Sequence, residues 1–287
     1  MSLDSKEFGL VFAQQLTGLE DLHYGYWDDS VPDTSVVYMK QAQQRYTDQL
    51  IDTLEHHGKP SMRVLDVGCG TGAVLEALSE RGHQVDGVIP APHLEKQVRG
   101  RVHRRGLDSQ VWGCTMEALP VSSIERRYDA VLFSESFQYI PYSVALDHAW
   151  ELLKPGGVVL ICDFFKTEHS GDGKPGDRSF GGGHKYHGFL DWLGTSEWRC
   201  VQNDDITAYT SPNIRLLDEL LTQRLAPAAS TLNTFLSSRH PWMLALFKRL
   251  FRKKLRKLEY KYLSGHRSQA VFERYKTYRR LVLIKPE

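Results

Sequence analysis

The stretch that decides the fold is VLDVGCGTG, at residues 64–72. It begins as a run of apolar residues and then places a glycine at every second position, at Gly68, Gly70 and Gly72. An apolar run that breaks into glycines is typical of a strand that turns directly into a helix. Glycine lets the backbone approach a ligand closely, and the start of a helix offers unpaired N–H groups to an anion. The stretch therefore predicts a strand, turn and helix that together hold a ligand.

Short strand-like segments alternate with helix-like segments on both sides of this turn. We expect strands at 62–67, 84–89, 110–113, 128–134, 157–164, 198–203 and 278–285, and helices at 36–55, 71–81, 92–104, 143–153 and 186–193, with several more between 213 and 263. Such alternation predicts parallel strands joined by crossover helices, so the fold class is α/β, with a doubly wound, seven-stranded, mostly parallel sheet. The KPGG at 154–157 is expected to end a helix and start the next strand, with Gly156 in a left-handed turn. The glycine-rich stretch at 169–184 predicts a mobile loop or lid.

The composition is that of a globular protein. The 287 residues are 41% hydrophobic and 25% charged, and neither an N-terminal signal nor an 18-residue apolar segment stands out. The four cysteines, Cys69, Cys114, Cys162 and Cys200, form no CxxC pair, which argues against a disulfide framework and against a zinc site. We therefore expect a cytoplasmic protein.

The pattern of the glycine turn separates two classes of ligand. A nicotinamide dinucleotide site needs GxGxxG and an acidic residue at the end of the second strand. This chain has GxGxG after Asp66, and its second strand ends in Ile89. An NAD-dependent oxidoreductase is therefore a disfavoured alternative.

The sequence resembles the class I S-adenosylmethionine-dependent methyltransferases, whose signature is an apolar strand ending in (D/E)xGxGxG, here residues 66–72. The resemblance continues in order through GVIPAPHL at 87–94, CTMEALP at 114–120, YDAVLFSESFQYI at 128–140 and ELLKPGGVVLICDFF at 151–165. About 100 residues are covered without a break. The family implies a Rossmann-like methyltransferase fold and S-adenosyl-L-methionine as cofactor.

An N-terminal segment, HYGYW at 23–27, looks like one found in small-molecule members related to the tocopherol and sterol methyltransferases. There it folds over the cofactor, which implies that Tyr24, Tyr26 and Trp27 cover the sulfonium with aromatic faces. The alternative is a hydrophobic staple ahead of the first long helix. The resemblance as a whole implies a cofactor site formed by Tyr24, Trp27, Asp66, Gly68, Cys69, Gly70, Thr71, Gly72, Ile89, Pro90, Thr115, Met116, Glu117 and Ser134.

Two positions depart from the family pattern. Many members carry an acid for the ribose hydroxyls where this chain has Ile89, although the subgroup with a GITLSP-like segment also lacks it. The adenine-facing acid aligns with Thr115, which leaves the backbone of Met116 and the carboxylate of Glu117 as replacements. Neither departure affects Asp66 or the glycines, so we still expect the cofactor to bind.

Methyl transfer requires an aligned acceptor and, for an oxygen or nitrogen acceptor, a general base. The candidates are Glu135, directly after the fourth strand, and His184 and His187 in GGGHKYHGF. Glu135 is alternatively a contact to the cofactor or a charge at a helix start, and the histidines are alternatively polar residues on the surface. The two histidines lack a third ligand, so no metal is expected.

A strongly basic helix is predicted near the C-terminus. Residues 239–287 hold 15 Lys/Arg against 3 Asp/Glu, whereas residues 1–238 hold 21 against 32. Within 242–263, apolar residues and basic residues form opposite arcs of a helix: Phe247, Phe251, Leu255, Leu258 and Tyr262, and Lys248, Arg249, Arg252, Lys253, Arg256 and Lys257.

This helix is expected to bury its apolar stripe on the core and to roof the acceptor pocket. The alternative is that it lies on an anionic membrane or binds a phosphate-bearing acceptor. No nucleic-acid partner is expected, because no aromatic residues for stacking are interleaved with the charges.

These observations predict five segments and one function. The segments are an N-terminal helical lid (1–60), a cofactor-binding core (61–165), a lid loop with the sixth strand (166–210), a helical cap inserted before the last strand (211–275) and a final core strand (276–287). The function is methyl transfer from S-adenosyl-L-methionine to O, N or C of a small, bulky apolar or amphipathic molecule. The alternative from another class is a binding protein that has kept the fold without activity.

Overall fold

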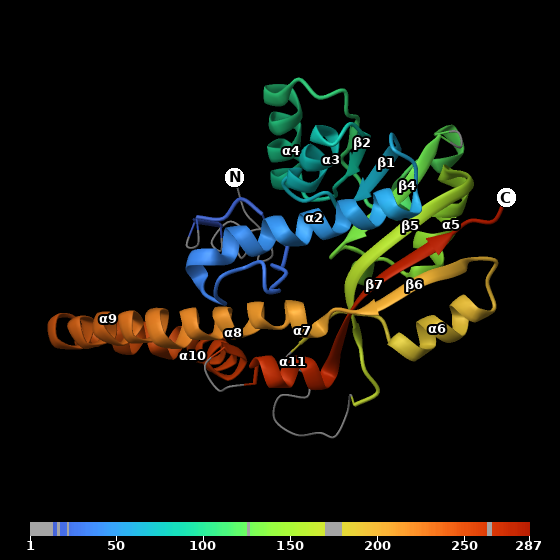
Figure 1. Ribbon diagram of the computed structural model, residues 1–287. Coiled ribbons are helices and arrows are strands. Elements are labelled where there is room, and N and C mark those ends of the chain that lie inside the picture. Colours follow the sequence, from blue (N-terminus) through green and yellow to red (C-terminus); the bar gives the residue numbers. More distant parts are fainter. Residues whose placement is uncertain (1–13, 16–17, 22, 125–126, 170–179, 263–265) are drawn as a thin grey trace.

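A seven-stranded sheet forms the centre of the molecule (Figure 1). The computed structural model describes residues 14–15, 18–21, 23–124, 127–169, 180–262 and 266–287. The strands are β1 (Arg63–Val67), β2 (Gln84–Val88), β3 (Val111–Trp112), β4 (Tyr128–Ser134), β5 (Leu153–Lys166), β6 (Arg199–Asp205) and β7 (Lys276–Ile284). Their order is β3-β2-β1-β4-β5-β7-β6, and β7 runs antiparallel to both of its neighbours. The predicted doubly wound, mostly parallel sheet is confirmed.

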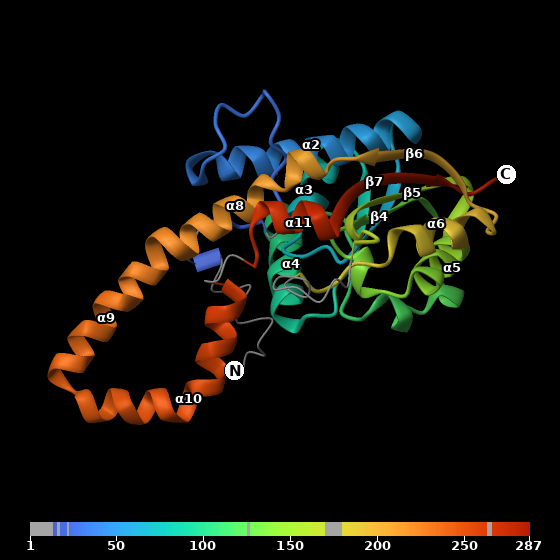
Figure 2. The same cartoon turned by 90° about the horizontal axis from the view of Figure 1, so that it is seen from below.

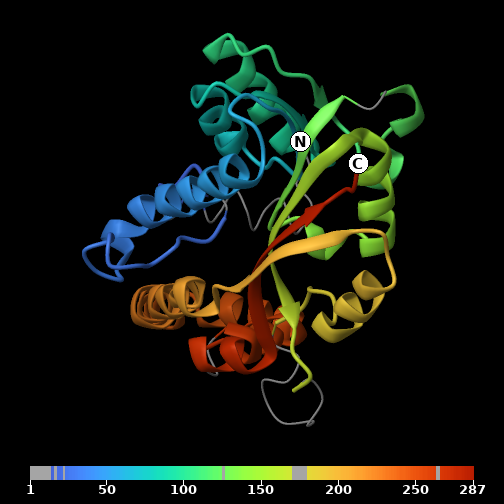
Figure 3. The ribbon, with the colours of Figure 1, turned by 45° about the vertical axis from the view of Figure 1, so that its right-hand side comes forward.

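Helices cover both faces of this sheet. One face carries α2 (Met39–His57), which follows η1 (Val36–Tyr38), together with α3 (Ala73–Glu80) and α4 (Pro92–Arg105). The other face carries η2 (Met116–Ala118), η3 (Val121–Ser123), η4 (Phe137–Tyr139), α5 (Tyr142–Leu152) and α6 (Tyr186–Gly194). Figure 3 shows the blue α2 on the opposite side of the sheet from the green α5 and the yellow α6.

Strand β1 explains why helices are needed on both faces. Val64 packs into the core cluster that contains Leu50 and Leu75, while Leu65 packs into the cluster that contains Phe133 and Ala149. A strand buried on both faces is apolar without alternation, as residues 64–67 are apart from Asp66. Asp66 is therefore the exception in this strand, because it is a carboxylate on a buried face.

The KPGG stretch does not separate a helix from a strand as predicted. Helix α5 ends at Leu152, and β5 already begins at Leu153. Gly156 has φ +71° but lies within the strand, where its N–H donates to the carbonyl of Lys285. Lys285 in turn donates its backbone N–H to Gly157. The chain following β7 therefore supplies partners that extend the strand, which local sequence could not reveal.

The segment between β6 and β7 is helical. It contains α7 (Thr207–Thr210), α8 (Pro212–Glu219), the π-helical η5 (Leu220–Leu225), α9 (Ala226–Arg239), α10 (Pro241–Tyr262) and α11 (Gln269–Tyr275). In Figure 2, α9 continues the line of α8 away from the sheet, and α10 begins at the far end of α9 and turns back toward the body of the molecule. Within the described ranges, no helix has both the length and the apolar character that a bilayer crossing needs.

The expected burial of the basic helix is wrong. The side chains of Trp242 and Leu250 in α10 are each 70% exposed, and those of Leu246 and Phe247 are about half exposed. Both faces of the sheet are already covered by other helices, so the apolar stripe of α10 has no core surface left to cover. The predicted glycine-rich loop at 169–184 falls mainly on residues 170–179, which lie outside the described residues.

Candidate functional site

The glycine turn joins β1 to α3 in a conformation that only glycine adopts readily. Gly68, Gly70 and Gly72 have φ values of +79°, +55° and +83°. A Cβ on Gly68 would overlap the Cβ of Ser136, and one on Gly72 would lie 2.6 Å from Cγ2 of Val98. At Gly70 a Cβ would meet nothing closer than 4.0 Å. The outer two glycines thus permit close packing, and the middle one leaves open space beside the start of α3.

Asp66 lies just before this turn and is almost completely buried, at 2% exposed. Among the described residues its Oδ2 atom has no hydrogen-bond partner. Burial raises the pKa of Asp66 to about 7. A buried carboxylate oxygen without a donor marks a place where a donor or a cation from a ligand fits.

The ends of the neighbouring strands meet at the same edge of the sheet. After β2, Ile89 is buried in the core, and its N–H donates to the carbonyl of Trp112, while Pro90 is exposed. After β3, Met116 is buried and accepts at its carbonyl from Nδ1 of His148. Thr115 and Glu117 on either side are exposed. An apolar Ile89 side chain cannot replace a ribose-binding acid, whereas exposed Glu117 keeps a free carboxylate near this edge.

The HYGYW segment is held as a strap by backbone hydrogen bonds. The N–H of Tyr24 donates to Oε1 of Glu135 over 2.7 Å. The side chain of Asn213 accepts from the N–H of Gly25 and donates to its carbonyl. The next two N–H groups donate to the carbonyls of Ala42 and Tyr209. The strap therefore joins β4, α2 and the α7–α8 region at one end of the sheet.

The aromatic residues of the strap point to different places. Tyr24 packs against Phe272 and Tyr278, with ring centroids 6.3 and 5.8 Å apart. Tyr26 stacks on Tyr209 at 4.7 Å. Trp27 is buried in a small separate cluster between α2 and α8. The structure thus brings Tyr24 to Glu135, but it places Trp27 in the packing beneath the strap.

Glu135 is the centre of a hydrogen-bonded network that the sequence did not reveal. Its Oε1 also accepts from the hydroxyl of Tyr278 at 2.8 Å. That hydroxyl lies 3.0 Å from the hydroxyl of Tyr46, which is 3.3 Å from Oγ of Ser134. His23 stacks on Tyr46 at 4.7 Å. Five residues from four distant segments thus form one polar cluster at the end of β4.

The backbone and the charge of Glu135 are both unusual. It is the one residue other than glycine with positive φ, +56°, in the described part of the chain. Its N–H donates to the carbonyl of Cys162. Burial raises its pKa, although His23 and the bonds from Tyr24 and Tyr278 act in the opposite direction. Strained backbone and a raised carboxyl pKa are features that concentrate at functional sites.

A second buried carboxylate, Asp163, lies near Glu135. Asp163 is fully buried and accepts from the backbone N–H and the side-chain amide of Gln138. Burial raises its pKa to about 8, and the charge of Glu135 adds to this shift. Lys276 is also buried, and burial lowers its pKa to about 8. Its ammonium donates to the carbonyl of Gly182 at 2.6 Å, so it fixes the chain at the end of the predicted lid loop.

The two histidines are not brought to this cluster. Nε2 of His184 lies 3.0 Å from the carbonyl of Phe137, and its ring packs edge-on against Phe137 and Tyr142. His187 is exposed, with Glu168 at 3.8 Å. Of the three candidate bases, only Glu135 lies at the end of β4 beside the strap.

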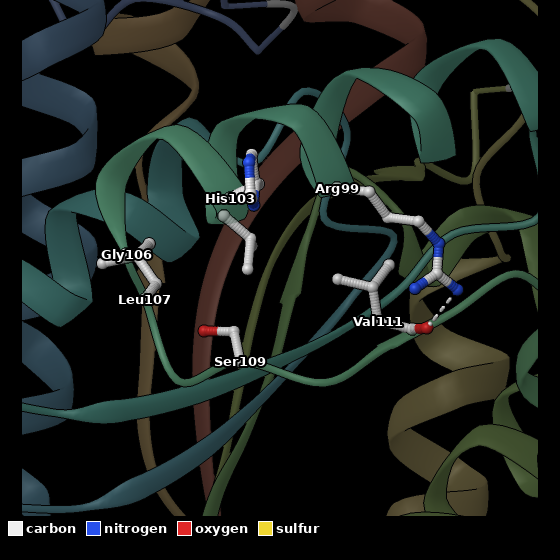
Figure 4. Close-up of a pocket in the computed structure, with 7 residues that line it drawn as sticks. Arg99, His103, Gly106, Leu107, Ser109 and Val111 are labelled. Carbon is white, nitrogen blue, oxygen red and sulfur yellow. Dashed lines mark hydrogen bonds between the residues drawn. The ribbon is translucent and has the colours of Figure 1, made fainter.

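Two hollows on the surface of the described residues lie away from this cluster. One, of about 460 Å³, lies between the end of α4 and the loop to β3, where Arg99 donates to the carbonyl of Val111 (Figure 4). Another, of about 610 Å³, lies next to Trp27 and is lined by three aspartates, Asp28, Asp29 and Asp33. Neither contains Asp66, Glu135 or a glycine of the turn, so the site rests on its buried polar atoms.

Comparison with known proteins is consistent with this geometry. A family model described as a methyltransferase domain matches residues 38–217, more than half of the chain. The mitochondrial ubiquinone biosynthesis O-methyltransferase of Mus musculus is 28% identical over 179 residues, which cover 56% of this chain and 45% of that protein. The chain thus spans about half the length of the curated relatives it matches.

Solved structures share the fold. A putative sarcosine dimethylglycine methyltransferase from Galdieria sulphuraria superposes with a TM-score of 0.69 at 18% identity, covering 96% of this chain and 97% of that one. Geranyl diphosphate C-methyltransferase from Streptomyces coelicolor A3(2), in complex with Mg²⁺, geranyl-S-thiolodiphosphate and S-adenosyl-L-homocysteine, gives 0.65 at 17% identity, covering 96% and 91%. At these identities the likeness is one of fold.

Proposed function

Because the chain belongs to the methyltransferase-domain family, we propose that it transfers a methyl group from S-adenosyl-L-methionine to a small, bulky apolar or amphipathic molecule. The observation that carries this proposal is the buried, unpartnered Oδ2 of Asp66 beside the glycine turn. The name of the mouse relative supports an oxygen acceptor, and that of the Streptomyces coelicolor neighbour a carbon acceptor. These names support O and C, and we propose O, N or C as the methylated atom, with N taken from the sequence prediction.

The residues of the site fit the cofactor. Asp66 provides a buried acceptor, Gly70 leaves open space, and the first N–H groups of α3 have no partner within the helix. Tyr24 is bonded to Glu135 after β4, and the exposed Glu117 follows β3, so the strand order β3-β2-β1-β4 puts them on opposite sides of β1. These residues would hold S-adenosyl-L-methionine, which supplies a methyl group on a positively charged sulfur.

The acceptor side is aromatic. Phe164, Phe180 and Tyr24 pack around Phe272, with ring centroids 5.3 to 6.3 Å apart. Tyr278 joins this group at 5.8 Å from Tyr24 and donates to Glu135. Such a wall suits an apolar acceptor that presents one polar atom to a carboxylate. In this arrangement Glu135 takes the proton of an oxygen or nitrogen acceptor, and burial, which raises its pKa, makes it a stronger base than an exposed glutamate.

The cofactor assignment predicts ligand-dependent stability. Thermal unfolding should be recorded with S-adenosylmethionine, S-adenosylhomocysteine and NAD in turn. A ligand at about 100 times its Kd stabilises the native state by about 2.7 kcal/mol, which raises the Tm of a domain of this size by roughly 5–10 °C. We expect this shift with both sulfur ligands and none with NAD.

Each outcome has a distinct meaning. A shift with NAD alone would replace the proposal by the oxidoreductase alternative. A shift with S-adenosylhomocysteine but no transfer of labelled methyl to an alkylphenol, an alkylamine or an unsaturated lipid chain would favour the non-catalytic binding protein. No shift with any ligand would make Ile89 and Thr115 signs of a lost site.

Two substitutions at Glu135 distinguish its role as a general base from its role in holding the strap. Glu135→Gln keeps an oxygen that accepts from Tyr24 and Tyr278, so Kd for S-adenosylhomocysteine should stay unchanged. Since a general base contributes about 10²- to 10⁴-fold, kcat for an oxygen or nitrogen acceptor should fall by at least about 100-fold. Glu135→Ala should also release the strap and weaken cofactor binding. His187→Gln, at an exposed position, is the control. Full turnover in Glu135→Gln would reduce Glu135 to a positioning residue.

We also propose a cytoplasmic location. The four cysteines are free thiols, and Cys69 and Cys162 among them are buried. Free buried thiols suit a reducing compartment.

A further inference from the structure

Helices α9 and α10, residues 226–262, form an arm that leaves the body of the molecule (Figure 2). Every side chain of α10 described by the structure is exposed apart from that of Leu244, which is partly exposed. The helix is nevertheless strongly two-sided in sequence. An amphipathic helix whose apolar side faces water in isolation needs an external surface to cover it.

The apolar side consists of two neighbouring rows with a spacing of four residues. One row is Trp242, Leu246 and Leu250, and the other is Met243, Phe247 and Phe251. All six are exposed, and the rings of Phe247 and Phe251 touch at 4.7 Å. Residues four apart lie on one face of a helix, so the two rows form one continuous stripe.

The basic side also consists of two rows. Lys248, Arg252 and Arg256 form one, opposite the middle of the apolar stripe, and Arg249, Lys253 and Lys257 form the other, along the edge of the stripe that carries Trp242, Leu246 and Leu250. Residues 241–262 hold eight Lys/Arg and one acid, Glu259, which gives a net charge of +7. The partner must therefore combine an apolar layer with a dense negative charge.

An anionic phospholipid bilayer has both properties, and we propose that α10 lies in the headgroup region of such a membrane. The apolar rows enter the acyl boundary, and the basic row along the edge of the stripe, Arg249, Lys253 and Lys257, contacts lipid phosphates. A second copy of the chain would bring two helices of charge +7 together, which repel each other. A nucleic acid would neutralise the charge but would leave six exposed apolar side chains without a partner.

The arm is connected to the proposed acceptor side, so membrane contact would serve the delivery of an acceptor. This role rests on the proposed function. The arm continues from α8, whose Asn213 holds Gly25 of the strap by two hydrogen bonds. The strap in turn binds Glu135 and carries Tyr24 into the aromatic wall. Membrane docking through α10 therefore holds the protein at the source of an apolar acceptor by an arm that leads, through α8 and the strap, to the acceptor side.

Vesicle flotation of the full chain tests the proposal. Vesicles of phosphatidylcholine with about 30% phosphatidylglycerol, which supply the anionic surface that a basic amphipathic helix needs, should carry the protein upward. Vesicles of phosphatidylcholine alone should not. Because each Lys or Arg near an anionic surface contributes about 1 kcal/mol, Arg249→Gln/Lys253→Gln/Lys257→Gln should weaken partitioning by about 100-fold or more. Trp242, the one exposed residue among six tryptophans that all lie in the described ranges, should shift its emission to the blue on binding.

Two further variants separate the contributions. Leu246→Ser/Leu250→Ser removes apolar contact without changing charge and should also lose binding. Lys40→Gln/Lys96→Gln/Arg104→Gln removes three exposed basic residues from the body and should float like the wild type. Thermal stabilisation by S-adenosylhomocysteine should be equal in all variants, so a failure of the cofactor assignment is distinguishable from a failure of the membrane contact.

Three results would overturn the proposal. The first is equal flotation of the wild type and the basic-row variant. The second is binding to heparin or single-stranded RNA without binding to anionic vesicles, which would assign the arm to a nucleic acid. The third is a stable dimer in sedimentation whose formation depends on Leu246 and Leu250, which would assign the apolar stripe to a second copy.

Discussion

Asp66→Asn is expected to weaken binding of S-adenosylmethionine and S-adenosylhomocysteine strongly. The buried Oδ2 of Asp66 has no hydrogen-bond partner among the described residues. A donor from the cofactor would therefore give this atom a hydrogen bond that it otherwise lacks. Hydrogen bonds to charged groups contribute about 1.5–3 kcal/mol, which corresponds to about a 10- to 150-fold increase in Kd. Isothermal titration calorimetry with S-adenosylhomocysteine measures this change directly.

The same substitution should make the ligand-free protein less sensitive to pH. The pKa of Asp66 is raised by burial to about 7, whereas an aspartate in the unfolded chain has a pKa of about 3.9. The native state therefore holds this proton more tightly, and stability is lost as the pH rises from about 4 to about 7. The amide introduced by Asp66→Asn does not titrate, so the variant should gain stability relative to the wild type across this range. Urea unfolding at several pH values between about 5 and about 8, which span the folded-state pKa, shows the difference.

Asp129→Asn is the matched control. Asp129 accepts from the backbone N–H of Arg63 and from Lys154, and these contacts hold its pKa below the usual value although burial acts in the opposite direction. Its contribution to stability is therefore present above the unfolded pKa and lost as the pH falls. The variant should be destabilised near neutral pH and should bind the cofactor normally. Equal cofactor affinity in the Asp66 and Asp129 variants would disprove the role assigned to Asp66.

Gly68→Ala is expected to be among the most destabilising single-methyl changes in the chain. The new Cβ would overlap that of Ser136, whose hydroxyl is bound to the carbonyl of Val67, so the neighbour cannot move freely. The left-handed backbone adds a second penalty. Together these cost about 2–5 kcal/mol, which lowers Tm by roughly 5–15 °C. Cofactor binding should be lost as well, because the turn would move.

Gly82→Ala separates the two penalties. Gly82 has φ +90° and nothing within 4 Å of the added Cβ, so only the backbone penalty of about 1–2 kcal/mol applies. It lies at the other end of α3 and should leave cofactor affinity unchanged. If both variants lose the same stability, close packing of Gly68 against Ser136 is not what the turn requires.

The parts of the fold that could be predicted depend on contacts between residues close in sequence. The glycine turn at 68–72 has a local signature, since positive φ demands glycine wherever the rest of the chain lies. Strand β4 was predicted with its observed bounds, because a strand buried on both faces has a run of mostly apolar residues in its sequence. The left-handed conformation predicted for Gly156 is confirmed, with φ +71°, but the predicted helix-to-strand boundary at KPGG is wrong because Gly156 pairs with Lys285, which lies far away in the sequence, beyond the end of β7.

The candidate site divides in the same way. Its cofactor half follows from a motif in which Asp66 and the glycines are neighbours. Its acceptor half joins Tyr24, Tyr46, Glu135 and Tyr278, and Asp163 joins them through charge. None of the spacings between these residues is periodic, so the sequence singled out Glu135 only as the residue that follows a strand.

By itself, the sequence determined the α/β sheet, the glycine turn and the amphipathic character of residues 242–262, because each depends on the spacing of residues that are close in sequence. Tertiary structure decided which carboxylates are buried, which aromatic of the strap reaches Glu135 and that α10 stands away from the core. These properties arise from burial and from hydrogen bonds between segments far apart in the chain. Such contacts contribute free energy only after the sheet has brought the segments together.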